Sequence, residues 1–598
     1  MSARTVYSLL EATAEELGSA PALMQPVGGG RRPSYRRYSW IEFRDAVREL
    51  AVALAGAGIG KGDVVAIASE TRAELYLADF AIMARGAVSA VLYTSYDARD
   101  LVATLRACSA RAVFAEDRAM RERLLEAGAG ELDLQWFLLL GGDEDETVPT
   151  LERLRERGRN EIKRNPALWL SLSEQVAQED PAILYLTSGA TGEPKMALVA
   201  HRAVVANADL GPSVLGAGPN DVTIAFLPSA HILQRVVMEM LMVRCGVQIW
   251  FSESLLKLPQ ELASIEPTML IAPPRLWERV YKTVTLEVKK RPQALQKLIY
   301  LALGAGSRAA ELRAAGKPVP AWLRRTDKLA KALVFRRLRH RFGRRLRFAA
   351  TGAAPLGTDL ARFYLAIGVP LHEGFGLTEG GIVILNPLGR QKPGSIGRPL
   401  PGVEVRLASD GELLVRSPYG FIGYFRDPAA TAAVLDAEGW LHTGDLCRQD
   451  EDGYLYITGR KKEVVVTSAG RKIFPQLVEN LFRTEPVISQ VFLVGDRLPY
   501  PAALITINPA GALSLAGMEA YRDRPLAEIA HAPAVATEVE RAVARVNARL
   551  PEFDRIRRYR ILEREFTIED GELTATLKQR RMRIQENFRS IIDELYRD

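Results

Sequence analysis

A loop rich in glycine and hydroxyl side chains constrains this chain more than any other feature. Residues 185–195 read Tyr-Leu-Thr-Ser-Gly-Ala-Thr-Gly-Glu-Pro-Lys and follow the apolar run Ala182–Leu184, which predicts a short buried strand. Backbone N–H groups, hydroxyls and a lysine at the end of a strand are suited to holding a phosphate. The spacing excludes the P-loop of the common NTPases, because Glu-Pro separates Gly192 from Lys195. The loop therefore predicts a phosphate site of another kind.

Seven further segments follow this loop along the chain. They are Leu227–His231, Thr351–Pro355, Gly374–Glu379, Gly411–Arg416, Gly439–Asp445, Gly453–Glu463 and Gly571–Lys578. Together with the loop, and in the same order, they resemble the motifs of the adenylate-forming superfamily, which contains acyl-CoA synthetases, luciferases and nonribosomal-peptide adenylation domains. The segments Leu227–Arg235 and Val494–Tyr500 and a helical insert near 281–345 are most similar to the AMP-forming long-chain fatty acyl-CoA synthetase branch. Three positions depart from the usual pattern of these proteins: Ala190, Met196 and Gln234.

The length and the cysteine content limit the class of protein. A chain of 598 residues is too long for one core and predicts two or more domains. The cysteines are far apart and form no CxxC pair, which argues against a disulfide framework or a zinc site and favours a reducing compartment. These cysteines are Cys108, Cys245 and Cys447. Acidic residues near the N-terminus exclude an apolar signal peptide, and Leu75–Tyr93 carries charges typical of a core helix followed by a strand. We expect a cytoplasmic protein.

The apolar patterns predict an α/β protein with two domains. Strand and helix patterns alternate from about residue 40 to 400, which indicates layered sheets and helices, and short strands dominate from about 402 to 460. We therefore expect an AMP-binding domain over 1–460, with the helical insert at about 281–345 and a β-rich subdomain at about 402–460. A small α+β domain over 461–598 follows, and the resemblance implies that it is mobile about a hinge at Lys462. It should end in a helix with one apolar face, formed by Ile584, Phe588, Ile591, Ile592 and Leu595.

The net charge of +7 is concentrated in one segment. Arg324–Arg347 contains eleven lysines and arginines and a single acid, Asp327. Apolar residues recur between the charges and predict a basic amphipathic helix. They are Leu329, Leu333, Val334, Leu338 and Phe342. Two interpretations stay open: a solvated face above a core-facing stripe, or peripheral contact with anionic lipids at the inner face of the membrane. Nucleic acid is disfavoured, because no aromatic-interleaved basic motif accompanies the charge.

The resemblance implies that the chain activates a fatty acid with ATP. Joining a carboxylate to the α-phosphate brings two anions together, so positioning and electrostatic stabilisation carry the chemistry. The implied ATP and AMP site comprises Thr187, Ser188, Gly189, Thr191, Gly192 and Lys195 at the phosphates, Gly352, Ala353, Ala354, Phe375 and Gly376 around adenine, Asp445 at the ribose, and Arg460 at the ribose or the α-phosphate. Phe375 offers a flat face for stacking, and a carboxylate such as Asp445 can accept from both ribose hydroxyls.

Four residues are expected to act on the reacting groups. Glu379 is the predicted ligand of a single Mg²⁺, since this hard cation prefers carboxylate and phosphate oxygens. The resemblance implies that Thr378 donates to the α-phosphate and that His231 lies near the substrate carboxylate. Lys578 matches the C-terminal lysine of the family, whose ammonium can bridge the carboxylate and the α-phosphate.

The acceptor of the acyl group stays open between coenzyme A and a carrier protein. The resemblance implies that the small domain swings about Lys462, bringing Gly470, Arg471 and Lys472 toward the adenylate to bind coenzyme A. A fatty acyl-AMP ligase that loads an acyl carrier protein is the nearest alternative. The departures at Ala190, Met196 and Gln234 leave a third possibility, a homologue that binds adenylate or lipid without catalysis.

Overall fold

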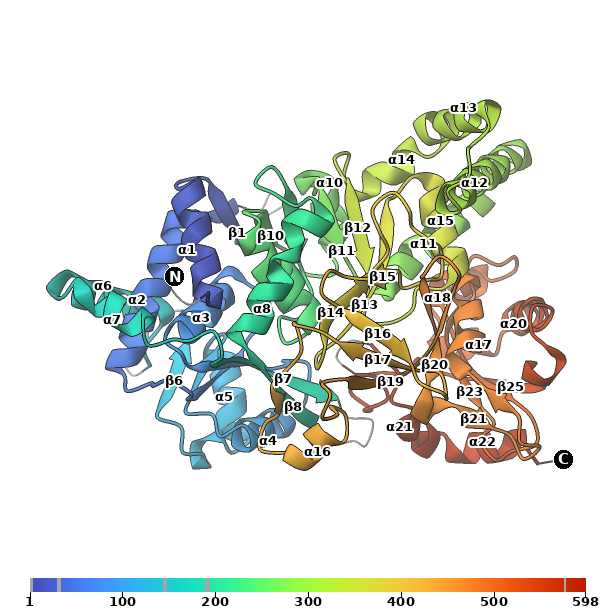
Figure 1. Cartoon of the computed structure of the whole chain (residues 1–598). Coiled ribbons are helices and arrows are strands. Elements are labelled where there is room, and N and C mark those ends of the chain that lie inside the picture. Colours follow the sequence, from blue (N-terminus) through green and yellow to red (C-terminus); the bar gives the residue numbers. More distant parts are fainter. Residues whose placement is uncertain (1–3, 29–33, 143–147, 189–193, 575–576, 598) are drawn as a thin grey trace.

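A computed structural model describes residues 4–28, 34–142, 148–188, 194–574 and 577–597, without the side chains of 187, 188 and 194. Figure 1 shows layered sheets and helices in the N-terminal two thirds, a β-rich layer, and a C-terminal body that packs beside them. The predicted α/β architecture is confirmed, with a large N-terminal part and a smaller C-terminal part.

One sheet, in the order β18-β8-β7-β4-β3-β5-β6, carries the glycine-rich loop. Its parallel strands β3, β4 and β5 are buried throughout, as expected where helices cover both faces. Its strands are β3 (Val64–Ala68), β4 (Val88–Val91), β5 (Ala112–Ala115), β6 (Trp136–Leu139), β7 (Pro181–Ser188), β8 (Pro194–Ala200) and β18 (Gly423–Tyr424). The nearby helices are α2 (Trp40–Gly56), α3 (Ala73–Ala84), α4 (Ala98–Ala107), α5 (Arg118–Glu126), η1 (Ala129–Glu131), α6 (Leu151–Arg164) and α7 (Ala167–Ser173).

Two further sheets complete the large part, in the orders β2-β1-β10-β9 and β11-β12-β13-β14-β15. Their strands are β1 (Pro21–Val27), β2 (Ser34–Ser39), β9 (Val222–Ala225), β10 (Gln248–Phe251), β11 (Met269–Ile271), β12 (Phe348–Thr351), β13 (Leu371–Leu377), β14 (Gly381–Leu385) and β15 (Arg398–Pro399). Their helices are α1 (Val6–Leu17), α8 (His201–Ala208), η2 (Gly211–Leu215), η3 (Leu233–Leu241), α9 (Met242–Arg244), α10 (Leu258–Ile265), α11 (Pro274–Lys289) and α15 (Thr358–Ile367). Trp277 of α11 is fully buried and donates from Nε1 to the Ala272 carbonyl at 3.1 Å, which fixes α11 to the end of β11.

The helical insert projects from the body at the upper right of Figure 1. It comprises α12 (Gln293–Ala314), α13 (Ala321–Leu329), η4 (Ala330–Val334), α14 (Arg336–Arg339) and η5 (His340–Phe342). The prediction of one continuous basic helix over 324–347 was wrong. Here Val334 packs against the core, while the adjacent Leu333, about 100° further round the helix, faces away from it. The chain breaks around buried Phe335, and Leu329 and Leu333 stay 59% and 78% exposed.

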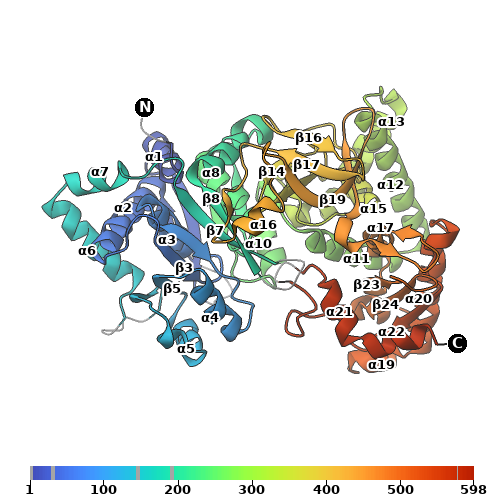
Figure 2. The same ribbon diagram turned by 60° about the horizontal axis from the view of Figure 1, so that its bottom comes forward.

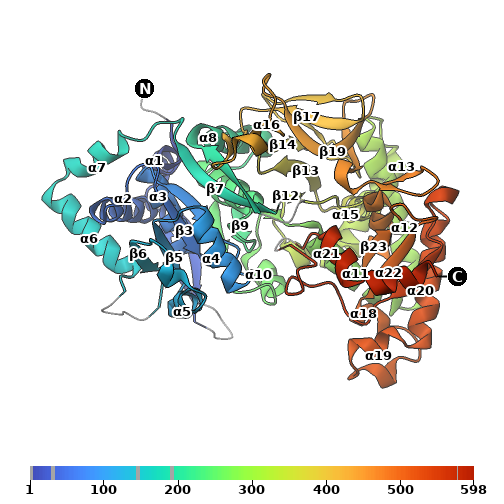
Figure 3. The same cartoon turned by 90° about the horizontal axis from the view of Figure 1, so that it is seen from below.

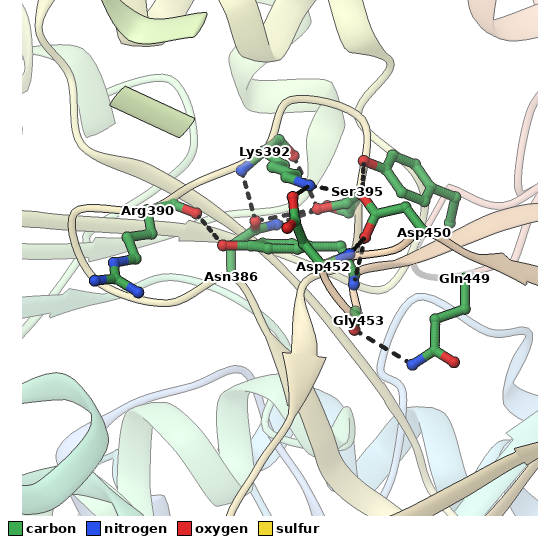
Figure 4. Close-up of polar contacts among 10 residues, drawn as sticks. Asn386, Arg390, Lys392, Ser395, Gln449, Asp450, Asp452 and Gly453 are labelled. Carbon is green, nitrogen blue, oxygen red and sulfur yellow. Dashed lines mark hydrogen bonds and ion pairs between the residues drawn. The ribbon is translucent and has the colours of Figure 1, made fainter. Parts of the chain in front are cut away.

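The β-rich layer has the order β16-β17-β19-β20, and Figure 2 shows β16 and β17 beside β14. Its elements are β16 (Glu404–Leu407), β17 (Glu412–Arg416), α16 (Pro428–Ala432), β19 (Leu441–Gln449) and β20 (Leu455–Arg460). A hydrogen-bonded loop joins this layer to β14 (Figure 4). The Lys392 ammonium pairs with Asp450, at 2.8 Å, and with Asp452, while its backbone N–H donates to Asn386 Oδ1 at 2.9 Å. Asn386 in turn donates to the Ser395 carbonyl, so the layer is held firmly against the sheet that ends in β15.

The C-terminal part has its own core. Its sheet has the order β23-β24-β25, and β21 pairs with β22. Its elements are η6 (Lys461–Glu463), β21 (Val465–Val466), β22 (Lys472–Ile473), α17 (Pro475–Leu481), η7 (Phe482–Thr484), β23 (Ile488–Val494), β24 (Ala502–Ile507), α18 (Pro509–Ala512), η8 (Glu519–Tyr521), α19 (Leu526–Ala530), α20 (Pro533–Asn547), η9 (Glu552–Asp554), β25 (Arg558–Ile561), α21 (Arg581–Asn587) and α22 (Arg589–Leu595). The expected C-terminal helix is two helices that meet at Phe588, although Ile584, Phe588 and Leu595 are buried as the pattern predicted. None of the described helices has the length and apolar character needed to cross a membrane.

Candidate active site

A cavity of ≈ 670 Å³ lies where the large part, the β-rich layer and the C-terminal part meet. One end is polar and the other is apolar. Twelve of the residues proposed from the sequence line it, although they come from segments up to 383 residues apart (Lys195 to Lys578). They are Lys195, His231, Gly352, Ala353, Phe375, Gly376, Thr378, Glu379, Asp445, Arg460, Lys462 and Lys578.

The other proposed residues lie elsewhere or outside the described residues. Ala354 does not line the cavity. Gly470, Arg471 and Lys472 are exposed, and the Arg471 guanidinium lies 4.1 Å from the centre of the Phe553 ring. Gly189, Thr191 and Gly192 fall outside the described residues, as does the departure at Ala190, and the side chains of Thr187 and Ser188 are not described either.

Strand pairing places Asp445 beside Arg460. The two residues are directly opposite each other on β19 and β20, and Arg460 Nε lies 3.0 Å from Asp445 Oδ1. Asp445 is buried, which raises the pKa of its carboxyl group, while the Arg460 guanidinium opposes this effect. The Asp445 backbone N–H donates to Thr443 Oγ1 at 3.1 Å, so a side chain of β19 itself also holds this part of the strand. The pair forms one polar wall of the cavity.

Thr378 and Glu379 lie in the turn that joins β13 to β14. Gly376 is needed there, because a Cβ would come within 2.8 Å of the Gly381 carbonyl oxygen. Ala353, on the facing wall, adopts φ +69°, which is rare for a residue other than glycine and suits a tight turn under the cavity.

Tyr424 connects Glu379, the predicted metal ligand, with Lys195, a predicted phosphate residue, and the sequence analysis did not identify it. Its hydroxyl donates to Glu379 Oε1 at 2.7 Å, and Lys195 Nζ lies 4.8 Å from the centre of its ring. Burial, with the neighbouring Glu379 carboxylate, raises the pKa of Tyr424. Tyr424 reaches this place because β18 pairs with β8, the strand that carries Lys195. A Gly-Tyr dipeptide 229 residues away from Lys195 gives no local signal of such a role.

Lys578 enters the same polar end from the C-terminal part. Burial and the Arg460 guanidinium lower its pKa to about 8, while the carboxylates of Asp445 and Glu379 act in the opposite direction. The backbone N–H of Lys578 donates to Thr574 Oγ1 at 3.1 Å. A lysine in this position is charged at neutral pH and can still lose its proton at moderately alkaline pH.

His231 is neutral in this cavity. Burial, followed by the charge of Lys578, lowers the pKa of its imidazole to about 3. Its Nδ1 accepts from the Leu233 backbone N–H at 3.1 Å, so the ring hydrogen is on Nε2. The neutral ring can therefore donate a hydrogen bond to an anionic ligand but cannot supply a positive charge.

The apolar end is walled by two π-helical segments, η2 and η3. Side chains facing the cavity recur every four residues along η3, at Leu233, Val237 and Leu241. The opposite face of η3 is anchored in the core, where Arg235 Nε lies 2.8 Å from Asp79 Oδ2 and both side chains are completely buried. The remaining apolar lining includes Leu210, Val214, Leu215, Ile232, Val236, Ile271, Phe348 and Leu385.

Two departures from the family pattern have structural explanations. Gln234 does not line the cavity; it is fully buried, donates to the Tyr76 hydroxyl at 2.9 Å and accepts from the Leu227 N–H at 3.3 Å. Met196 lies in β8 opposite Leu186 of β7 and packs against a buried apolar cluster. Neither residue removes a polar group from the cavity.

A further carboxylate at the polar end, Glu412, was also missed by the sequence analysis. Glu412 of β17 is buried and accepts from the Gly444 N–H at 2.9 Å and from Lys461 Nζ at 3.0 Å. Burial alone would raise the pKa of Glu412. Lys461 and the Gly444 N–H donor lower it by more than this, so the pKa is below its usual value and the group is ionised. The pair ties the residue next to the predicted hinge to the β-rich layer.

Comparison with known proteins agrees with this geometry. The sequence model described as "AMP-binding enzyme" matches residues 10–425, and that described as "AMP-binding enzyme C-terminal domain" matches residues 462–598. The chain belongs to the AMP-binding enzyme family. This AMP-binding enzyme is 34% identical over 568 residues to "Long-chain-fatty-acid--CoA ligase FadD15" of Mycobacterium bovis, covering 93% of this chain and 91% of the relative. It is 28% identical to "Long-chain-fatty-acid--CoA ligase 1" of Homo sapiens, covering 96% and 84% respectively.

Solved structures confirm the fold of this AMP-binding enzyme. The anthranilate CoA ligase AuaEII in complex with anthranoyl-AMP superposes with a TM-score of 0.75 at 20% identity, covering 99% of each chain. The adenylation domain of a carboxylate reductase from Mycobacterium chelonae gives the same TM-score and identity, covering 99% of this chain and 91% of that domain. The prediction of an adenylate-forming enzyme is confirmed at the level of family and fold.

Proposed function

We propose that this AMP-binding enzyme activates a long-chain fatty acid with ATP and transfers the acyl group from the adenylate to coenzyme A. One observation carries the proposal: the polar end, with Lys578, Asp445 and Glu379, opens into the apolar chamber walled by η2 and η3. A fatty acid in the chamber would place its carboxylate at the polar end, where a nucleotide phosphate could meet it. The relatives named as long-chain-fatty-acid–CoA ligases support the same substrate class.

In this proposal the protein acts mainly by positioning two anions. Lys578 offsets the repulsion between the fatty carboxylate and the α-phosphate, and Thr378 donates a hydroxyl hydrogen bond to that phosphate. The neutral His231 orients the carboxylate through Nε2–H. Asp445 and Arg460 hold the ribose, and Phe375 with the Gly352–Ala354 turn encloses adenine. Lys195, with residues 187–192, holds the β- and γ-phosphates.

Glu379 is the residue we propose as ligand of Mg²⁺. No group of three or more His, Cys, Asp and Glu side chains able to hold a metal occurs among the described residues. A single carboxylate fits this ion, because Mg²⁺ is commonly bound by one or two carboxylates together with substrate phosphates and water. The bound ion would neutralise charge that develops on pyrophosphate. Tyr424, which donates to Glu379 Oε1, fixes the orientation of the carboxylate.

We further propose that the chain divides at 460/461 into an adenylation domain and a mobile domain that turns about Lys462. Lys462 is exposed in the short 3-10 helix Lys461–Glu463 between the two parts, and no residue of this helix is buried. Rotation would withdraw Lys578 and bring the exposed loop that contains Gly470, Arg471 and Lys472 toward the adenylate. Its two cations suit the phosphates of coenzyme A.

The test of the function uses both half-reactions. ATP–pyrophosphate exchange, driven by a panel of saturated acids from short to very long, should be strongest with long-chain acids. Purified acyl-AMP should then give acyl-CoA with free coenzyme A and no acyl transfer to a holo acyl carrier protein. Transfer to the carrier alone would favour the alternative acyl-AMP ligase, and the absence of exchange with every acid would overturn the enzymatic proposal.

We also propose that part of the segment Arg324–Arg347, together with exposed residues of α12 and the start of α13, contacts an anionic membrane surface. The contact comprises the exposed apolar residues Leu298, Leu301, Trp322, Leu329 and Leu333. Exposed cations at 324, 325, 328, 336 and 337 flank them and have no acidic partner among the described residues, whereas Arg341, Arg344 and Arg347 pair with Glu287, Glu266 and Asp221. Partial insertion of apolar side chains beside cations suits anionic lipid headgroups.

Vesicle co-sedimentation tests this contact. The protein should sediment with phosphatidylcholine vesicles that contain phosphatidylglycerol and much less with phosphatidylcholine alone. Leu333→Ser should weaken sedimentation several-fold, since it removes a 78%-exposed apolar side chain, while Leu256→Ser, 82% exposed but outside the insert, should leave it unchanged. Equal effects of the two substitutions would contradict the assignment.

A further inference from the structure

A charged contact joins α11 of the large part to the C-terminal part. Arg483 Nη1 pairs with Glu278, and Lys282 Nζ donates to the Ile488 carbonyl oxygen at 2.7 Å. Arg275 Nη1 lies 3.0 Å from Glu278 Oε2 and donates to the Ser489 carbonyl oxygen at 3.2 Å. Figures 2 and 3 show α11 beside the C-terminal elements. We call this set of residues the α11 contact.

The α11 contact is buried, unlike most ion pairs on this molecule. The side chain of Glu278 is 3% exposed and that of Arg483 22%. Burial raises the pKa of Glu278, but Arg483 and Arg275 more than offset this, so its pKa is below the usual value and the group is ionised. Lys282 is also buried, which lowers its pKa to about 8. Separation of the two parts would take Arg483 away from Glu278 and the Ile488 carbonyl away from Lys282, leaving Glu278 with Arg275 of its own helix.

The two carbonyl groups that accept hydrogen bonds from α11 both belong to β23, which lies at one edge of the C-terminal sheet. The segment after Lys578 is held by the same strand. Gln579 Nε2 donates to the Val491 carbonyl at 3.0 Å, and Arg581 Nη2 donates to the Leu493 carbonyl. A short and continuous path therefore runs from α11 through β23 to Lys578.

The other end of the path begins at the cavity. Helix α11 follows β11, whose Ile271 lines the cavity, and buried Trp277 fixes the helix to that strand. The α11 contact thus connects the apolar chamber and the C-terminal lysine through elements that are each packed in a core. A displacement of β23 relative to α11 would move Lys578 relative to Asp445 and Glu379.

We propose that Glu278 and Lys282 are positioning residues, which hold β23 and so keep Lys578 in the cavity for adenylation. The inference rests on the proposed two-step function, because it assigns the contact to the first step. The contact has to break for the second step, so its strength sets the balance between the two arrangements of the C-terminal part. Residues of α11 far from the reacting groups would then change one half-reaction and spare the other.

Two substitutions on α11 weaken the contact at two separate points. Glu278→Gln leaves the Arg483 guanidinium without its buried counter-charge, and Lys282→Met removes the donor to Ile488. Each should slow the single-turnover rate of adenylation about tenfold or more, since the competent arrangement becomes less populated. Conversion of supplied acyl-AMP to acyl-CoA should be unchanged or faster. Arg545→Met is the matched control, because Arg545 pairs with Glu485 and Glu538 within the C-terminal part.

A distance measurement tests the contact without relying on activity. Spin labels at Ser171→Cys in α7 and Thr537→Cys in α20 report on the two parts, and the native cysteines are buried. The unsubstituted protein should show one main distance, and Glu278→Gln and Lys282→Met should each add a second. An unchanged distance distribution, or an equal loss of both half-reactions in correctly folded variants, overturns the proposal. If the unsubstituted enzyme shows no adenylation, the proposed function fails, while the distances still decide whether the contact holds the two parts together.

Discussion

The charge of Lys578 gives the sharpest test of the adenylation site. The ammonium serves adenylation only when it is protonated, and burial together with Arg460 lowers its pKa to about 8. The charged fraction of such a group falls from about 90% at pH 7 to about 10% at pH 9. Adenylation should therefore be full below pH 7 and fall about tenfold between pH 7 and pH 9 as the proton is lost.

Two substitutions separate this effect from other titrations. Lys578→Arg keeps a cation that stays protonated over this range, so its adenylation rate, whatever its absolute value, should show no fall centred near pH 8. Lys578→Ala should lower adenylation by about 10²–10³-fold, the usual cost of removing one group that stabilises transition-state charge. Conversion of supplied acyl-AMP to acyl-CoA should persist in both variants.

The assay is the single-turnover formation of acyl-AMP from fatty acid and ATP below saturation, so that the free enzyme's pKa governs the rate, followed by quenching at each pH. Two results would refute the reasoning. One is an alkaline fall that persists unchanged in Lys578→Arg, which would assign the titration to another group. The other is equal loss of both half-reactions in Lys578→Ala, which would make the lysine structural.

Three other residues give independent predictions. Asp445→Ala should raise the KM for ATP, because a charged hydrogen bond worth about 1.5–3 kcal/mol is lost, and should leave the KM for fatty acid nearly unchanged. Steady-state kinetics with each substrate varied test this, and an unchanged KM for ATP would contradict the ribose assignment. Tyr424→Phe removes the hydroxyl that donates to Glu379, so the Mg²⁺ concentration for half-maximal adenylation should rise several-fold, and an unchanged Mg²⁺ dependence would contradict this placement. Lys462→Pro restricts the backbone at the proposed hinge, so adenylation should survive while thioester formation falls by orders of magnitude, and rates that fall together would rule out Lys462 as the pivot.

Local patterns predicted the elements of the fold well. Val64–Ala68 became β3 as expected, since an unbroken apolar run of this length is typical of a strand buried on both faces. The segments that carry Phe375, Asp445 and Lys578 were found because each forms a short sequence motif. The structure brings all three residues into one cavity. In these cases the information lies within a few neighbouring residues.

The rest could not be read from the sequence, because it depends on pairing between distant segments. Tyr424 becomes part of the site only because β18 pairs with β8, and Glu412 only because Lys461 folds back on β17. The basic segment looked like one helix because its apolar residues recur at helical spacing. That spacing does not show where the chain has to bend to bury a residue such as Phe335 in the neighbouring core. Leu333 satisfied the helical spacing and yet lies in solvent, since the buried stripe passes through Val334 instead.

The π-helical wall of the chamber has a consequence for how this enzyme could change its substrate range. A π-helix carries one more residue per hydrogen-bonded turn than an α-helix, so the deletion of a single residue from η3 would let the backbone return to α-helical bonding. Such a deletion would rotate the side chains on one side of it by about 100°, moving several of Leu233, Val237 and Leu241 relative to the chamber in one step. Substitutions alter this wall one side chain at a time. Insertions and deletions in η3 would alter its shape as a whole, while the polar end and its chemistry stay the same.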